Sequence, residues 1–214
     1  MDSMIKTFVS TAAFAAMLAF GAQQASAAGC LAGDTAAVPA LSTSDVTIDF
    51  MGSTLSATAC AGLFDGNDIT GSGGTLLGLL NGGLFASYTT EDWAVFGKSD
   101  DPGSGVIAPE STSGVFSIDF TPESYSTFVI SLKGASYFAA YLFDLTPFDT
   151  SMVSGEFTMF GRINPGDQNV FADLSHLGVI TYGEPSVIPL PAAGWLLLSG
   201  LGGLALLRRR RKTT

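Results

Sequence analysis

Residues 127 to 143 read T-F-V-I-S-L-K-G-A-S-Y-F-A-A-Y-L-F, and this stretch carries the strongest structural signal in the chain. Its first half alternates with a period of two, which places Phe128, Ile130 and Leu132 on one face of a predicted strand. The second half, residues 136–143, is rich in aromatic side chains, and Gly134 lies in the short connection between the two halves. The pattern predicts a β-hairpin with a buried face.

Six further segments are predicted as short strands, and no capped helical period occurs between residues 28 and 186. Residues 65–74 are predicted to form a polar, Gly-rich loop, and Asn164-Pro165-Gly166-Asp167 is a strong turn signal. Eight short strands in total predict an all-β fold, an antiparallel β-sandwich or jelly roll whose inner faces bury the phenylalanines and Trp93. The six segments are residues 45–51, 54–60, 91–98, 115–120, 152–160 and 174–182.

The region from residue 28 to residue 186 is strongly acidic. It holds 18 of the 19 acidic residues and only three basic ones, Lys98, Lys133 and Arg162, which gives a formal charge of −15. Because the phosphates of a nucleic acid need cationic partners, this charge argues against nucleic acid as a partner. It suits an exported domain whose copies repel one another.

The first 27 residues have the composition of a secretory signal peptide. Lys6 precedes an almost wholly apolar run, residues 8–22, and Ala25 and Ala27 supply the small residues of a signal-peptidase site. Two alternatives stay open. One is an N-terminal membrane anchor, for which the apolar run is short; the other is lipoprotein processing at Cys30, which follows Ala28-Gly29.

The last 28 residues, 187–214, carry a membrane signal. Residues 192–207 hold no charge and few polar side chains, and a cationic block follows at once. Such a block stops translocation and stays in the cytoplasm, so we expect one transmembrane helix with a periplasmic ectodomain at residues 28–186. As a helix the apolar run spans about 24 Å, less than the hydrocarbon thickness of a bilayer. The cationic block consists of Arg208, Arg209, Arg210, Arg211 and Lys212.

The chain has two cysteines, Cys30 and Cys60. In an oxidising compartment an even pair predicts one disulfide, which would tie the mature N-terminus to the first hairpin. Closing a loop of this length would stabilise the fold by about 3 kcal/mol. Two free thiols, or a lipidated Cys30, are the alternatives.

The segment before the apolar run resembles a known sorting signal. Ile188, Pro189, Leu190, Pro191 and Ala192, followed by a Leu- and Gly-rich run and the cationic block, resemble the tail of the VPLPA-CTERM group of PEP-CTERM proteins, with Ile188 in place of the usual Val. The resemblance implies a substrate of an exosortase, a membrane transpeptidase of Gram-negative bacteria, which cuts near the Pro-Leu-Pro segment. An ordinary single-span anchor is the alternative. A weaker resemblance extends to residues 60–68, 93–98 and 173–176.

Between residues 28 and 186 no pattern singles out a catalytic residue, a metal ligand or a cofactor site. His176 is the only histidine and is expected to be packed in, or at the edge of, a strand. Asp65-Gly66-Asn67-Asp68 resembles a calcium loop but fails the EF-hand pattern, because Ile69 lacks an oxygen ligand and Thr70 replaces the sharp-turn glycine, so a solvated turn is expected.

We therefore expect a non-catalytic protein that crosses the inner membrane and reaches the cell surface or an extracellular matrix. Its expected partners are the membrane, signal peptidase, an exosortase and, as a candidate, an extracellular polysaccharide. One alternative is a carbohydrate-binding or adhesin-type module, which an exposed cluster among Trp93, Tyr125, Tyr137 and Tyr141 would favour. A hydrolase is a third possibility, which a cleft that gathers His176 with two carboxylates would favour.

Overall fold

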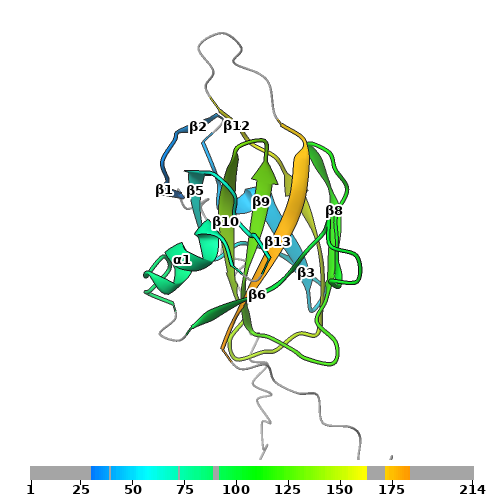
Figure 1. Cartoon of the computed structure of the whole chain (residues 1–214). Helices are drawn as coiled ribbons and strands as arrows, with labels where there is room; N and C mark the ends of the chain where they lie inside the picture. Colours follow the sequence, from blue (N-terminus) through cyan, green and yellow to red (C-terminus); the bar gives the residue numbers. More distant parts are fainter. Residues whose placement is uncertain (1–29, 39, 72, 89–91, 163–171, 184–214) are drawn as a thin grey trace, which may run out of the picture.

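The computed structural model describes residues 30–38, 40–71, 73–88, 92–162 and 172–183. These residues form two facing β-sheets, with one short helix against the outer side of the larger sheet (Figure 1). The predicted all-β sandwich is thereby confirmed. The predicted signal peptide, the tail from residue 187 and the turn at residues 164–167 lie outside the described residues.

The larger sheet has six strands. Every pair of neighbouring strands in it is antiparallel except β1 with β5, which is parallel. Its centre is the predicted hairpin, in which β9 and β10 pair from Gly134 opposite Tyr137 to Thr127 opposite Asp144. In order across the sheet, the strands are β1 (Leu31–Ala32), β5 (Ala59–Asp65), β10 (Tyr137–Asp144), β9 (Thr127–Gly134), β13 (Leu174–Tyr182) and β6 (Trp93–Lys98).

The smaller sheet has five strands and is antiparallel throughout. Its order is β4 (Ser53–Ser56), β3 (Val46–Phe50), β11 (Met152–Thr158), β8 (Ser113–Asp119) and β7 (Val106–Ile107). A separate pair joins β2 (Ala37–Val38) to β12 (Gly161–Arg162), and a 3₁₀ turn, η1 (Thr43–Asp45), leads into β3.

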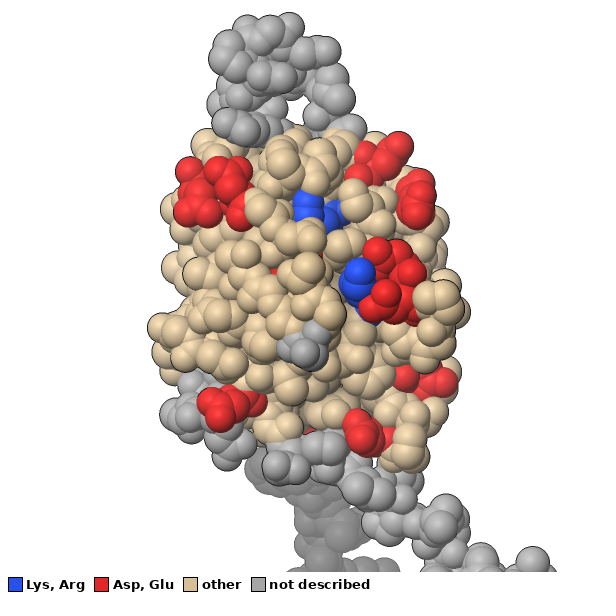
Figure 2. All heavy atoms as spheres, viewed as in Figure 1, with Lys and Arg blue, Asp and Glu red and all other residues tan. Residues whose placement is uncertain are grey.

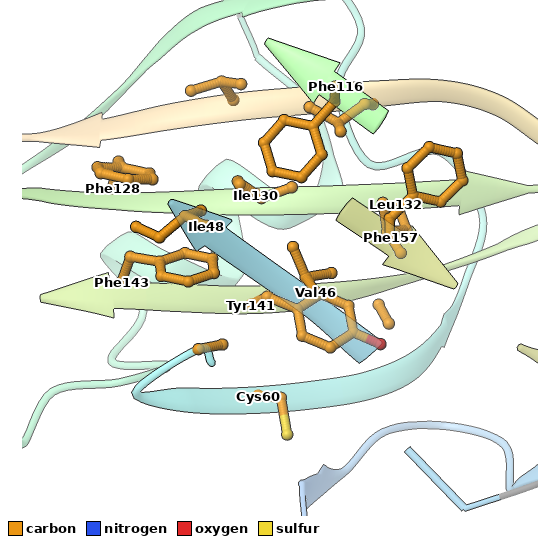
Figure 3. Packing of buried hydrophobic residues seen from close by; sticks show 14 of the residues in the cluster. Val46, Ile48, Cys60, Phe116, Phe128, Ile130, Leu132, Tyr141, Phe143 and Phe157 are labelled. Carbon is orange, nitrogen blue, oxygen red and sulfur yellow. The ribbon is translucent and has the colours of Figure 1, made fainter. Parts of the chain in front are cut away.

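The space between the two sheets is filled by the side chains that the period-two pattern assigned to the inner faces. Figure 3 shows Phe128 and Ile130 of β9 against Ile48 of β3 and Phe116 of β8. All four side chains are buried, and the rings of Phe128 and Phe143 stack with centroids 5.5 Å apart. The alternation in residues 45–51, 115–120 and 127–133 therefore did identify the inward faces.

A second apolar core lies on the outer side of the larger sheet, and it was not predicted. The helix α1 (Thr75–Asn81) packs Leu76 and Leu80 against the sheet, where Trp93 is also buried. Trp93 is therefore buried as expected, but beneath the helix and not between the sheets. Asn81 fixes this arrangement, because its side-chain oxygen accepts from the backbone N–H of Trp93 at 2.8 Å.

The helix escaped prediction because it has only seven residues and no side-chain cap. Its first residues instead donate to loop carbonyls, Thr75 N–H to Asn67 and Leu76 N–H to Asp68. Gly74 makes this close contact possible, since a Cβ there would lie 2.2 Å from the carbonyl oxygen of Asp68. A second correction concerns residues 54–60, which split between β4 and β5 and so belong to both sheets.

The predicted disulfide is confirmed. Cys30 and Cys60 are bonded, with their Cα atoms 4.6 Å apart, and the bond ties the residue before β1 to the second residue of β5. Cys60 is buried in the core between the sheets, and both cysteines of the chain are used by this bond.

The last residues of strand β13 and the turn between β3 and β4 lie at the same end of the sandwich. In the larger sheet, Thr181 pairs with Phe128 at the start of β9, which pairs with Phe143 near the finish of β10. The chain then crosses to the smaller sheet through residues 145–151, and β11 starts beside the finish of β3. We call this end, which holds Gly183 and the β3–β4 turn and is drawn lowest in Figure 1, the exit end.

We predict that Cys30→Ala/Cys60→Ala lowers the free energy of unfolding by about 3 kcal/mol, because the open chain gains loop entropy when it unfolds. Urea unfolding followed by near-ultraviolet circular dichroism measures the change. A reductant should produce a similar loss in the wild type and no further loss in the variant. If the variant and the oxidised wild type had the same free energy of unfolding, the prediction would be contradicted.

Candidate functional site

A cluster of buried polar side chains lies under the loop that joins β5 to α1. Asp68 is fully buried there, and its carboxylate accepts from His176 Nε2 at 2.7 Å and from Ser131 Oγ at 2.6 Å. Ser131 and His176 are themselves buried, on β9 and β13. We call Asp68, Ser131 and His176 the buried triad. It joins three segments that are far apart in the sequence.

Local backbone features bring these side chains together. The register of β13 against β9 shifts between Leu174 and His176, and this bulge sets His176 opposite Lys133. Two residues on, Gly178 pairs with Ser131 and leaves room for the loop. A Cβ at Gly178 would lie 2.5 Å from Ile69 Cδ1 and 3.1 Å from Asp68 Oδ2, so a larger residue would displace the buried Ile69 side chain and crowd the Asp68 carboxylate.

The triad keeps Asp68 ionised in a buried position. Burial alone raises the pKa of this carboxyl group, but the hydrogen bonds from His176 and Ser131, the charge of His176 and the N–H of Ile69 outweigh it. The net effect lowers the pKa of Asp68 below its ordinary value of 3.8. A buried charge is tolerated only with partners of this kind.

Charged groups also line the outer side of His176. Asp100 Oδ2 lies 3.7 Å from His176 Nδ1 and 3.3 Å from Lys98 Nζ, and it is partly exposed. Lys133 is buried beside the triad, where its ammonium group donates to the carbonyl of Ala135. Burial lowers the pKa of Lys133, while the charge of Asp68 opposes this shift.

The order of contacts determines what chemistry the triad supports. In a Ser–His–Asp relay the histidine lies between the serine and the carboxylate, whereas here Asp68 lies between Ser131 and His176. The Ser131 hydroxyl thus donates to the carboxylate of Asp68 and not to the imidazole of His176. His176 does meet two carboxylates, Asp68 and Asp100, but none of the three grooves described below is lined by these residues. The arrangement is suited to pinning the loop and α1 onto the sheet.

The sequence placed His176 correctly in a packed strand, but its partners were missed. Residues 66–71, 73 and 74 form a loop as predicted, whereas Asp65 is the last residue of β5. Asp68 and Ile69 are buried, so the solvated turn expected there is wrong for these two residues. A weak signal was present: Ser131 and Lys133 are polar residues on the face of β9 opposite its apolar side chains. Buried polar groups on such a face need hydrogen-bond partners, and the single histidine of the chain, His176, was a candidate for that role.

The aromatic cluster proposed for carbohydrate binding is not formed at the surface. Trp93, Tyr125, Tyr137 and Tyr141 are all buried, and Tyr141 is completely so. The hydroxyl of Tyr141 contacts Asp45 Oδ2 at 3.2 Å, and burial, the charge of Asp45 and this hydrogen bond raise the pKa of Tyr141 well above its ordinary value. These residues hold the cores together and offer no stacking surface to a sugar.

The grooves on the described surface include one on the smaller sheet and two beside the disulfide. The most polar has a volume of about 440 Å³ and lies on the outer face of the smaller sheet, where Asp45 and Glu156 contribute carboxylates and Val115 an exposed apolar side chain. Its other side chains with polar groups are Ser44, Thr47, Ser113 and Thr158. The other two grooves flank the disulfide, at about 400 and 370 Å³.

Among the charged side chains seen in Figure 2, the acidic ones form several separate groups, while the basic ones form small patches, one of them beside an acidic group. Within the described ranges, no three His, Cys, Asp or Glu side chains gather closely enough to hold a metal ion. The one helix in these ranges, α1, is too short to cross a bilayer, and the apolar run at residues 192–207 lies outside them. The predicted cleavage site and the predicted sorting residues are outside them as well.

Comparisons with known proteins found no relative of this chain: no family model, no curated protein and no solved structure matches it. The sorting-signal resemblance stays a prediction that rests on residues 188–192 and the run that follows them.

We predict that Asp68→Ala lowers the free energy of unfolding by about 3 kcal/mol at neutral pH, because it leaves buried polar partners unsatisfied. The pKa of Asp68 is lower in the folded than in the unfolded chain, so its contribution is complete above about pH 3.8 and is lost as the pH falls through the folded pKa. The difference in the free energy of unfolding between wild type and variant should therefore become smaller as the pH falls below about 3.8.

Urea unfolding at a series of pH values measures this gap. The matched control is Asp65→Ser, at the last residue of β5 before the loop and with an exposed side chain, which should leave the stability nearly unchanged. A gap that stayed constant below pH 3.8, or an equal loss in both variants, would contradict the role given to Asp68.

Proposed function

We propose that this chain is an exported, non-catalytic protein that is held at the outer side of the inner membrane by its tail and then processed by an exosortase. The product reaches the cell surface or an extracellular matrix. The observation that carries the export half of the proposal is the Cys30–Cys60 bond, which uses every cysteine in the chain. Such bonds persist in oxidising compartments and are rare in the cytosol.

The surface supports the same proposal. A formal charge of −15 on residues 28–186 keeps copies of an exported domain apart and offers nothing to a nucleic acid. Two stacked cores and a buried triad give a rigid body. The strongest concentration of titratable side chains is committed to internal contacts and lines none of the three grooves, which favours a structural role for the domain.

The sorting half of the proposal rests on the tail. Pro189 and Pro191 restrict the backbone before the apolar run, because each fixes φ and lacks an N–H. An extended segment at the outer interface is the form in which a membrane protease could bind a substrate. The cationic block behind the run, residues 208–212, would hold the chain in place until cleavage.

We predict that the mature protein from a Gram-negative host with an exosortase begins at Ala28 and lacks residues 208–212. Pro189→Ala/Pro191→Ala should retain the cationic block, since a helical segment would no longer present an extended backbone. Intact-mass measurement with sequencing of both ends tests this. A wild-type product that still carried Arg208 would count against sorting, and one that kept residues 1–27 would count against signal-peptide cleavage.

A carbohydrate-binding or adhesin-type module is the second candidate, and the polar groove on the smaller sheet favours it. Carboxylates and hydroxyl groups there can accept and donate to sugar hydroxyls, and Val115 offers an apolar contact. An extracellular polysaccharide would be its ligand.

If this groove binds a glycan, Glu156→Ala should weaken the binding about tenfold, the effect of losing one hydrogen bond to a charged group. A glycan array screened with the full chain, followed by titration of the best ligand, measures the effect. Glu110→Ala, an exposed acid outside the groove, is the matched control. Equal affinities of the two variants would exclude this groove.

A further inference from the structure

Four large apolar side chains crowd the exit end of the sandwich. Met51 is 76% exposed, Phe148 is 51% exposed and Met152 is 66% exposed. Phe50 is partly buried, and its ring lies 6.4 Å from that of Phe148. We call these four side chains the apolar tip. Such a group on a protein surface marks a place of interaction with another molecule.

The tip is built on tight turns. Met51 and Gly52 have φ values of 50° and 78°, as in the two-residue turn that matches the twist of a hairpin, and this turn joins Phe50 to Ser53. Phe148 is held by its N–H, which donates to the carbonyl of Leu145 at 2.9 Å. These turns hold Met51 and Phe148 at the surface, while Phe50 packs partly against the core between the sheets.

The short segment between the sandwich and the predicted anchor limits how far the exit end can lie from a membrane. β13 finishes at the exit end, and only residues 184–191 separate Gly183 from the start of the apolar run at Ala192. Nine steps of an extended chain reach about 30 Å at most. A chain anchored through residues 192–207 must therefore keep its exit end close to the bilayer surface.

From these observations we propose that the apolar tip inserts into the boundary between headgroups and acyl chains of the bilayer that holds the tail. The sandwich would then stand on the membrane through its tip as well as through its linker. This inference rests on the membrane anchor of the proposed function. Aromatic and other apolar side chains bind the bilayer interface by burying their surface a few ångströms below the headgroups.

The charges near the tip select the kind of lipid. Asp49 and Asp149 flank the tip in sequence and are exposed, whereas Lys98 and Lys133 lie toward the opposite end of the larger sheet. An anionic bilayer would repel such a surface, while the ammonium groups of a zwitterionic lipid can pair with it. Zwitterionic lipids are therefore the expected partner.

The experiment uses the full chain in lipid nanodiscs, with an environment-sensitive fluorophore on a single added cysteine and the native disulfide kept oxidised. Met51→Cys reports on the tip. Ser175→Cys, exposed at the other end of β13, is the matched control. Ser199→Cys lies in the apolar run and tests the anchor separately. Nitroxide-bearing lipids serve as quenchers.

The expected result is a blue-shifted label at residue 51 that the lipid nitroxides quench severalfold more strongly than the label at residue 175. Adding phosphatidylglycerol to phosphatidylcholine discs should reduce the quenching at residue 51. If the label at residue 199 were quenched and the label at residue 51 were not, the proposal that the tip inserts would be wrong, while the proposed membrane anchor would be supported. Quenching at neither position would overturn the anchor and the tip together.

A label at residue 51 that is blue-shifted but not quenched by lipid would mean that a protein surface, such as a second copy of the chain, covers the tip. That result would also overturn the proposal. Near-ultraviolet circular dichroism of the labelled proteins checks that each variant keeps the native packing.

Discussion

The rest of the structure depends on the burial of one hairpin, β9–β10, on both of its faces. On one face Phe128, Ile130 and Leu132 meet the smaller sheet, and on the other Val129 and its neighbours meet α1. A strand pair that is apolar on one side and, apart from Ser131 and Lys133, apolar on the other cannot remain at a surface, because each face would leave a large apolar area in contact with water. Two covering layers are therefore required, and the chain supplies a sheet and a short helix.

The second covering layer has a consequence for polar groups. The loop that leads to α1 has to cross the sheet directly, and Asp68 is carried under it and out of contact with solvent. Its charge is compatible with this position only because Ser131 and His176 are both within hydrogen-bond distance. The buried triad is thus a result of the fold, and it joins the helix layer to two strands of the sheet.

The same layering leaves other surfaces free for interaction. The outer face of the smaller sheet is covered by no described element, and its polar groove lies there. The apolar tip lies at the exit end, where the chain heads toward the predicted anchor. This acidic body with one apolar end is the arrangement on which the proposed export and membrane contact rest.

Much of this protein was predictable from the sequence, because the signals involved are local. Period two assigned the inward faces of β3, β8 and β9, since alternate side chains of any strand point to opposite faces. The cysteine count predicted the disulfide. The anchor and the sorting signal that the tail from residue 188 predicts lie outside the described residues and stay predictions.

The tertiary structure alone decided the second core, the capless helix that covers it, the place of Trp93 beneath that helix, and the burial of Tyr125, Tyr137 and Tyr141. It also decided the pairing of Asp68 with His176, which are 108 residues apart in the sequence. Which distant residues come into contact depends on how the sheets and the helix pack, and no local pattern of side chains carries that information.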